Sequence, residues 1–202
     1  INITMKLIRP EEVSLAVEIL KNDGLVAFPT DTLYGLGGNA YSLEAVQNVF
    51  RCKGRGLEKP FSVCYSSLEQ AAADVEITER VRFLAEKFLP GPLTLILRKK
   101  PGSKLCSFCS NAEGGVGIRV PDNQVVLDLL QRLDFPLTAT SANKSGEISP
   151  KNAEEVQHGL QDYAGDLVVI DGGSCSLGMA STIVDLCGSV PKVIRVGAIN
   201  PL

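Results

Sequence analysis

Residue types that often carry chemistry or mediate binding are scarce in this sequence. Its 202 residues include no Trp and a single His, and aromatic residues make up only 5%. So few aromatic residues argue against a protein that stacks single-stranded nucleic acid on its side chains. One His excludes a zinc site built from several His ligands and argues against a Ser-His-Asp or Cys-His catalytic group. His158 stands before Gly159 near a predicted helix end, which is typical of a partner for the helix dipole.

The sequence also lacks long apolar runs and a strong net charge. No apolar stretch approaches the ~20 residues of a transmembrane helix, and Ile1–Lys6 lacks the layout of a secretory signal. The net charge of -3 gives no general attraction to nucleic acid. A local basic patch from Lys53, Arg55, Lys59 and residues 98–100 stays open. We expect a cytoplasmic protein with no membrane association.

Disulfide, metal and nucleotide-binding motifs are missing as well. The six Cys residues have no tight framework, which favours reduced thiols. Cys106 and Cys109 have metal or redox spacing, but a second pair would have to come from distant positions, so we expect no protein-borne metal. Residues 35–38 lack the third glycine of a dinucleotide fingerprint, and no P-loop motif is present. Any bound nucleotide must therefore be held by residues outside these known motifs.

What the chain does contain is an alternation of helical and strand-like segments. Its 202 residues, 45% hydrophobic and 21% charged, predict a single domain over residues 1–202 with a sizeable core. Ser42, Thr78, Asp122 and Asn152 are the expected helix N-caps. The mixture predicts an α/β or α+β sheet with helices packed on it. Helices are predicted within residues 13–20, 43–50, 81–88, 126–133 and 152–157, and strands at 25–28, 61–65, 93–97, 116–120, 137–140, 167–170, 183–186 and 193–196.

Several predicted strands run directly into turns rich in Ser and Thr. Residues 30–32 follow the strand 25–28, residues 140–141 end another strand, and residues 181–182 lie beside a third. In open α/β sheets ligands bind beyond strand ends, so these turns predict one site assembled from several loops.

A basic cluster, Lys53-Gly54-Arg55 followed by Lys59, comes about twenty residues after the first of these turns. Hydroxyls suit a small polar ligand and fixed cations suit polyphosphate, so the pair suggests an enzyme that brings a small substrate to a nucleotide. Taken alone, the turn could merely close a strand and the cations could be a solvated helix end. Ser149 could merely cap a helix. Arg119 is harder to dismiss, since an arginine within an apolar strand needs a partner or an anionic ligand.

Eight short motifs occur in order along the chain: Pro29–Leu36, Lys53-x-Arg55 with Lys59-Pro60, Pro90–Thr94, Arg119-x-Pro121, Thr140–Asn143, Asp171–Gly173, Ser181-Thr182 and Arg195-x-Gly197. Each motif alone is weak to moderate, but their order is highly specific. Together they resemble the YrdC family, the threonylcarbamoyl-AMP synthases, over roughly Val13 to Gly197. The resemblance implies a twisted mixed sheet with an open concave ligand face, in the short single-domain form.

The resemblance implies a nucleotidyltransferase that makes L-threonylcarbamoyladenylate and pyrophosphate from L-threonine, bicarbonate and ATP. The product would serve tRNA N6-threonylcarbamoyladenosine modification at position 37, through downstream threonylcarbamoyl-transfer proteins, with at most weak tRNA binding. ATP would be a substrate, and Mg²⁺ would be bound through its phosphates.

The resemblance also assigns site residues. Thr32, Arg119 and Ser181 would contact L-threonine, and Lys53 and Arg55 would hold the triphosphate as catalytic residues. Three departures stand out: Gly56 after the basic motif, Cys64 where some members have His, and the loop Cys106–Asn111. The positions that match ATP contacts are Lys53, Arg55, Lys59, Gly115, Ser141, Ser149 and Arg195.

Two other functions remain open at this point. One is an RNA-binding or ribosome-assembly module that uses a concave basic face, which the overall acidity and few aromatics weaken. The other is a carbamoyl-transfer domain of the hydrogenase-maturation type. Such proteins carry acylphosphatase and zinc-finger segments, and 202 residues are too few for both.

Overall fold

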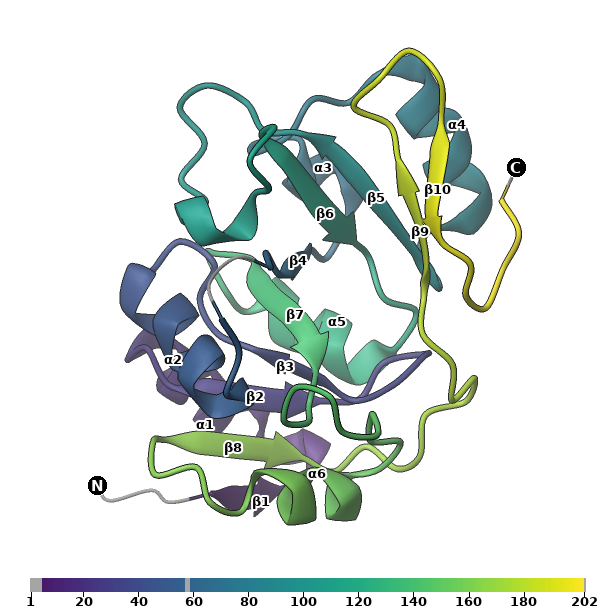
Figure 1. Ribbon diagram of the computed structural model, residues 1–202. Coiled ribbons are helices and arrows are strands. Elements are labelled where there is room, and N and C mark those ends of the chain that lie inside the picture. The colour runs from purple at the N-terminus through teal and green to yellow at the C-terminus, as the bar shows by residue number, and fades with distance from the viewer. Residues whose placement is uncertain (1–4, 57–58, 202) are drawn as a thin grey trace.

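A mixed sheet of ten strands organises the chain (Figure 1). The computed structural model describes residues 5–56 and 59–201, and the opening residues 1–4, discussed above for their lack of a secretory pattern, lie outside them. The strand order is β1-β8-β2-β3-β7-β4-β6-β5-β9-β10, with parallel and antiparallel pairs. The predicted α/β class is therefore confirmed.

The elements follow one another as the sequence predicted, with a few additions. The strands are β1 (Lys6–Ile8), β2 (Leu25–Phe28), β3 (Gly35–Gly37), β4 (Ser62–Cys64), β5 (Leu93–Arg98), β6 (Gly115–Arg119), β7 (Leu137–Ser141), β8 (Leu167–Ile170), β9 (Thr182–Asp185) and β10 (Lys192–Arg195). The helices are α1 (Val13–Lys21), α2 (Leu43–Lys53), α3 (Leu68–Ala71), α4 (Glu79–Phe88), α5 (Gln124–Gln131) and α6 (Ala153–Leu160), with 3-10 turns η1 (Pro10–Glu12) and η2 (Ser107–Cys109).

Strands β2 and β8 are buried on both faces, which explains why they appear in the sequence as continuous apolar runs. Leu25 and Ala27 pack into a core that includes residues of α2 and α6. Val26 and Phe28, which point the other way, join α1 and α5 in a second core. Figure 1 shows α2 and α6 in front of this half of the sheet, with α1 and α5 behind it. The sheet is thus held rigidly where its strands approach the polar turns.

Helix caps agree with the predictions except at one position. Ser42, Thr78 and Asn152 each accept a hydrogen bond from a backbone N–H in the first turn of α2, α4 and α6. The prediction that Asp122 caps the next helix is wrong. Asn123 does so, because its Oδ1 accepts from the Val125 N–H at 3.0 Å.

The elements that the sequence did not predict are short. β1, β3 and α3 span three, three and four residues, too few for a helical or strand period to be legible. Among the described residues, no helix has both the length and the apolar character needed to cross a membrane. All six cysteines carry free thiols.

Candidate active site

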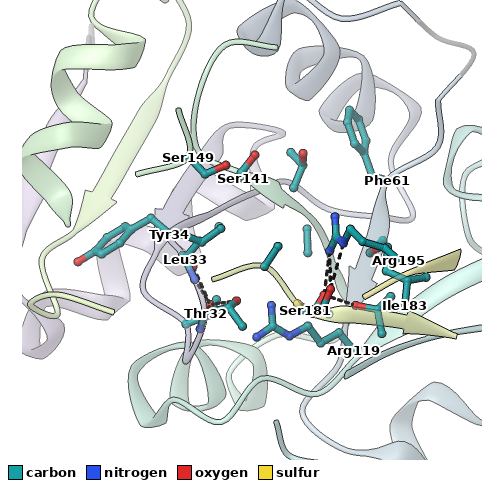
Figure 2. Close-up of a pocket in the computed structure, with 18 of the residues that line it drawn as sticks. Thr32, Leu33, Tyr34, Phe61, Arg119, Ser141, Ser149, Ser181, Ile183 and Arg195 are labelled. Carbon is teal, nitrogen blue, oxygen red and sulfur yellow. Dashed lines mark hydrogen bonds between the residues drawn. The ribbon is translucent and has the colours of Figure 1, made fainter. Parts of the chain in front are cut away.

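A cavity of about 340 Å³ opens between the two halves of the sheet, where the polar turns meet. Its walls come from the turn after β2 and from the ends of β4, β5, β6, β7 and β9. Most of the predicted site residues lie around this single space. Figure 2 shows them facing one another: Thr32, Arg119, Ser141, Ser149, Ser181 and Arg195.

The turn after β2 is folded around one buried hydroxyl. Thr30 Oγ1 accepts from the backbone N–H groups of Thr32 and Leu33, at 3.1 and 3.2 Å, and donates to the Leu33 carbonyl at 2.6 Å. The hydroxyl of Thr32 lies 3.0 Å from the same oxygen. A Thr at position 30 therefore fixes both the path of the turn and the place of the Thr32 hydroxyl on the cavity wall.

Tyr34, in the same motif, ties this turn to two distant loops. Its buried hydroxyl donates to the Gly173 carbonyl at 3.0 Å and accepts from the Gly172 N–H at 3.1 Å. Its backbone N–H donates to Pro150 and its carbonyl accepts from Ala142, both at 2.9 Å. Burial raises the pKa of Tyr34 to about 12, so the phenol stays a donor at neutral pH. Motifs about 140 residues apart are thereby joined at one side chain.

Arg119 lies at the end of β6, and its partner is now known. β6 runs parallel to β4 with Arg119 opposite Cys64. Arg119 Nη2 donates to Oδ1 of Asp31, which forms a buried ion pair. Burial raises the pKa of Cys64 to about 12, so its thiol is neutral beside the pair. The expectation that this arginine needs a partner is confirmed, and the partner comes from the turn after β2.

Arg195 and Ser181 form a second fixed group. The guanidinium of Arg195 donates to the Ser181 carbonyl from Nε and Nη2, at 3.0 and 2.9 Å, and to its hydroxyl at 3.2 Å (Figure 2). The Ser181 hydroxyl is also 2.9 Å from that of Thr94. Burial and the charge of Arg119 lower the pKa of Arg195. Gly197 is required here, because a Cβ on it would stand 2.3 Å from the Ala180 carbonyl oxygen.

A second, more open cavity of about 460 Å³ adjoins the first and shares Arg55, Ser141 and Ser149 with it. Lys59 and Gly56 also line it. Gly54 ends α2 in a left-handed conformation, with φ of 58°, which only glycine adopts without cost. This reversal brings Arg55 over the ring of Phe61, 5.1 Å from its centroid.

Lys53 is buried at the end of α2, where it lines the second cavity and binds oxygens of the turn after β7. Its Nζ donates to the Ser141 carbonyl at 2.6 Å, and to the carbonyl and side-chain oxygens of Asn143 at 2.7 and 3.2 Å. Burial, helped by the charge of Arg55, lowers the pKa of Lys53 to about 8. Lys53 therefore fixes the turn after β7 that carries Ser141.

Two residues singled out from the sequence lie elsewhere. Gly115 lines neither cavity; its N–H donates to Asn111 Oδ1 at 2.7 Å and its carbonyl accepts from the Asn111 N–H at 2.9 Å. His158 is exposed on α6 and lines neither cavity. Within residues 5–56 and 59–201, no three His, Cys, Asp or Glu side chains gather as a metal site.

Among the residues of the site that had no role assigned from sequence are Asp31, Thr94 and Asn143. Each stands inside one of the eight motifs, so a signal was present. What could not be seen is that Asp31 meets Arg119, Thr94 meets Ser181, and Asn143 meets Lys53, because these pairs are 88, 87 and 90 residues apart.

With this geometry in hand, comparison with known proteins gives consistent matches. The sequence model of the Sua5/YciO/YrdC family, which carries the description "Telomere recombination", matches residues 18–197. The threonylcarbamoyl-AMP synthase of Pyrococcus abyssi is 36% identical over 190 residues, which cover 93% of this chain and 54% of that protein. A putative threonylcarbamoyl-AMP synthase of Methanocaldococcus jannaschii is 36% identical over 196 residues, covering 94% of this chain and 89% of that protein.

A solved structure agrees with the sequence matches. The crystal structure of P. abyssi Sua5 complexed with L-threonine resembles this fold with a TM-score of 0.88 at 33% identity, covering 96% of this chain and 58% of that one. The chain spans about half the length of the P. abyssi and Bacillus subtilis relatives, 54% of each.

Proposed function

This chain belongs to the Sua5/YciO/YrdC family, and on that basis we propose that it is a threonylcarbamoyl-AMP synthase. The reaction would join L-threonine, bicarbonate and ATP into L-threonylcarbamoyladenylate and release pyrophosphate, which makes the enzyme a nucleotidyltransferase. The relatives named above carry this activity in their names, and one of their structures holds L-threonine.

The observation that carries the proposal is a cavity with two chemically different ends. The amino-acid end is formed by Thr32, Arg119 and Ser181, two hydroxyls and one guanidinium. The phosphate end, where the two cavities meet, is formed by Lys53, Arg55, Ser141 and Ser149. A carboxylate suits the first end and a polyphosphate the second, because guanidinium binds carboxylates through paired hydrogen bonds and several cations suit several phosphate charges.

The proposed reaction depends mainly on how the protein positions the substrates. The threonine amine and bicarbonate would form a carbamate with loss of water; a carbamate oxygen would then attack the α-phosphorus, and pyrophosphate would leave. Arg119 and Thr32 would hold the amino acid while Arg55 faces the departing phosphates. Cations fixed where negative charge develops lower the barrier to such transfers. Walls that exclude bulk water would protect the unstable carbamate.

We assign roles in ATP binding to Lys53, Arg55, Lys59, Ser141, Ser149 and Arg195, in line with their places around the two cavities. Lys53 would act partly through the turn it holds, since its three hydrogen bonds go to Ser141 and Asn143. Gly115, the remaining position that matches a family ATP contact, would act only through a backbone shift at the start of β6.

Mg²⁺ would enter with the nucleotide. The residues around the cavities offer mainly hydroxyls and carbonyls beside the cations, with one carboxylate, Glu147, at the more open cavity, and the carboxylate of Asp31 is engaged in an ion pair with Arg119. Such a set fits a cation that is bound mainly by phosphates and water rather than by the protein. When bound, Mg²⁺ would offset charge on the leaving pyrophosphate.

We further propose that residues 1–202 act as one domain in the cytoplasm, which the continuous sheet and the free thiols support. The product would pass to proteins that transfer threonylcarbamoyl to tRNA. The alternative of an RNA-binding or ribosome-assembly module has less support, because Arg55, Arg119 and Arg195 line a cavity walled largely by hydroxyls.

The direct test is threonine-dependent pyrophosphate release by the purified chain with ATP, bicarbonate and Mg²⁺. We expect pyrophosphate release that requires both L-threonine and bicarbonate. Mass spectrometry should detect a product that contains AMP joined to threonine. A folded chain that releases no pyrophosphate under these conditions would overturn the proposal. Binding of tRNA with a steep salt dependence and no turnover would instead favour the RNA-binding alternative.

A further inference from the structure

Asp31, between the two threonines of the turn after β2, makes an unusual contact for a residue beside an anion-binding cavity. Its carboxylate is buried, with 6% of the side chain exposed, and pairs with Arg119, whose side chain is 11% exposed. Nothing in the proposed reaction requires a carboxylate at the amino-acid end. A negative charge there even opposes the binding of a substrate carboxylate, so its presence calls for a physical reason.

The atoms of the pair show how Asp31 holds the guanidinium. Nη2 of Arg119 donates to Oδ1, while Nε of Arg119 and Oδ2 of Asp31 are buried and make no hydrogen bond within the described residues. A two-bond, side-on pair would use both Nε and Nη2. Asp31 therefore holds Arg119 through Nη2 alone, and the same side chain lines the cavity.

The backbone of Asp31 is held by other parts of the chain. Its backbone carbonyl accepts from the Leu177 N–H at 3.0 Å and from the Ser176 hydroxyl at 3.2 Å. On either side, the hydroxyls of Thr30 and Thr32 are linked to each other at 3.0 Å. The carboxylate is thus carried on a fixed turn, and it can impose one orientation on the long, otherwise adaptable side chain of Arg119.

We propose that Asp31 is a positioning residue that clamps Arg119 through Nη2 so that its guanidinium faces the carboxylate of an α-amino acid. The inference deepens the proposed function and rests on it in taking that amino acid to be L-threonine. Figure 2 shows the guanidinium of Arg119 pointing toward Thr32, which follows Asp31 in the turn after β2. Asp31 also offsets one charge, which leaves the amino-acid end suited to a ligand with a single carboxylate.

The test measures equilibrium binding by calorimetry, independent of turnover, for L-threonine and for L-threoninamide, which lacks the carboxylate. We compare the wild type with Asp31→Asn, Arg119→Ala and the double variant. We expect Asp31→Asn to weaken L-threonine binding about tenfold, as misorientation of a contact group does, and to leave threoninamide binding within about twofold. Arg119→Ala should weaken L-threonine at least as much, and adding Asp31→Asn to it should cause no further loss.

Controls separate positioning from folding. Asp162→Asn makes the same change in an exposed ion pair with Lys144, at 2.9 Å, and should bind L-threonine as the wild type does. If Asp31→Asn does not fold, the double variant, which leaves no lone buried charge, and Asp31→Glu replace it; Asp31→Glu should bind L-threonine more weakly than the wild type but still prefer it over threoninamide.

Several outcomes overturn the inference. One is that Asp31→Asn binds L-threonine as tightly as the wild type, and another is that it loses equal affinity for L-threonine and threoninamide. A third is that the double variant binds L-threonine more weakly than Arg119→Ala by the same factor that Asp31→Asn causes alone. The last is that the wild type binds neither compound. A wild type that binds L-threonine through the coupled pair but releases no pyrophosphate leaves the clamp standing and removes the proposed function instead.

Discussion

The two proposed ends of the cavity hold their cations in different ways. At the proposed amino-acid end, Arg119 is paired with the carboxylate of Asp31. At the proposed phosphate end, the partners of Lys53 are neutral oxygens of Ser141 and Asn143. A carboxylate partner fixes the side chain and cancels its charge, whereas neutral partners fix a position and leave the charge in place. The first arrangement suits a small ligand with one carboxylate, and the second suits a polyanion.

The largest effect of a substitution is expected at the phosphate end. We expect Lys53→Ala or Arg55→Ala to lower pyrophosphate release by roughly 10²-fold or more, as loss of a charge contact in the transition state does. Steady-state release with both substrates saturating measures this. Lys21→Ala, an exposed lysine in the last turn of α1, is the matched control and should keep the wild-type rate. Wild-type rates in both site variants would remove these residues from the phosphate end.

The same contrast should appear in the pH dependence of the rate, because burial lowers the pKa of Lys53 from its ordinary value of 10.5 to about 8. Only the ammonium has three hydrogens for its three acceptors, so release should fall about tenfold per pH unit above pH ~8. In Lys53→Arg, which stays charged, we expect a lower rate whose profile lacks that limb. An identical alkaline limb in both proteins would assign the titration to another group.

Stability should move in the opposite direction over the same range. Between pH ~8 and ~10.5 the unfolded chain binds more protons at Lys53 than the folded chain, so the free energy of unfolding rises with pH. Below pH ~8 both states are protonated and this site gives no slope. The shift corresponds to a gain of ~3 kcal/mol at most, measurable by urea unfolding of the wild type against Lys53→Met. A fall over this range specific to the wild type would contradict the lowered pKa.

What the sequence could predict here follows from the range of the interactions involved. The continuous apolar runs 25–28 and 167–170 predicted β2 and β8 with their correct bounds, because burial on both faces leaves a local mark. The need of Arg119 for a partner was also predictable, since it rests on the cost of a buried charge. The identity of that partner, Asp31, was not, because it depends on how strands β2 and β6 are arranged in the sheet.

The role of Lys53 was harder still. A lysine in a basic motif suggests a phosphate contact, and nothing local indicates that its Nζ turns inward to carbonyls 88 and 90 residues away. Similarly, the Pro90–Thr94 motif gave no hint that Thr94 faces Ser181 across the β5–β9 pair. These contacts are set by strand register, which a single sequence does not fix.

The smallest expected effect concerns a hydroxyl contact at the amino-acid end. Thr94→Val keeps the shape of the side chain and removes the hydroxyl that lies 2.9 Å from that of Ser181. Ser181 keeps its bonds from Arg195, so the loss should be that of one hydrogen bond, about 1 kcal/mol, and the KM for threonine should rise about fivefold with the KM for ATP unchanged. Thr138→Val, which removes a buried hydroxyl bonded to Gly38 and lining neither cavity, should cost similar stability without changing either KM. An unchanged threonine KM in Thr94→Val would mean that the Ser181 hydroxyl needs no support from β5, and that Arg195 alone orients it.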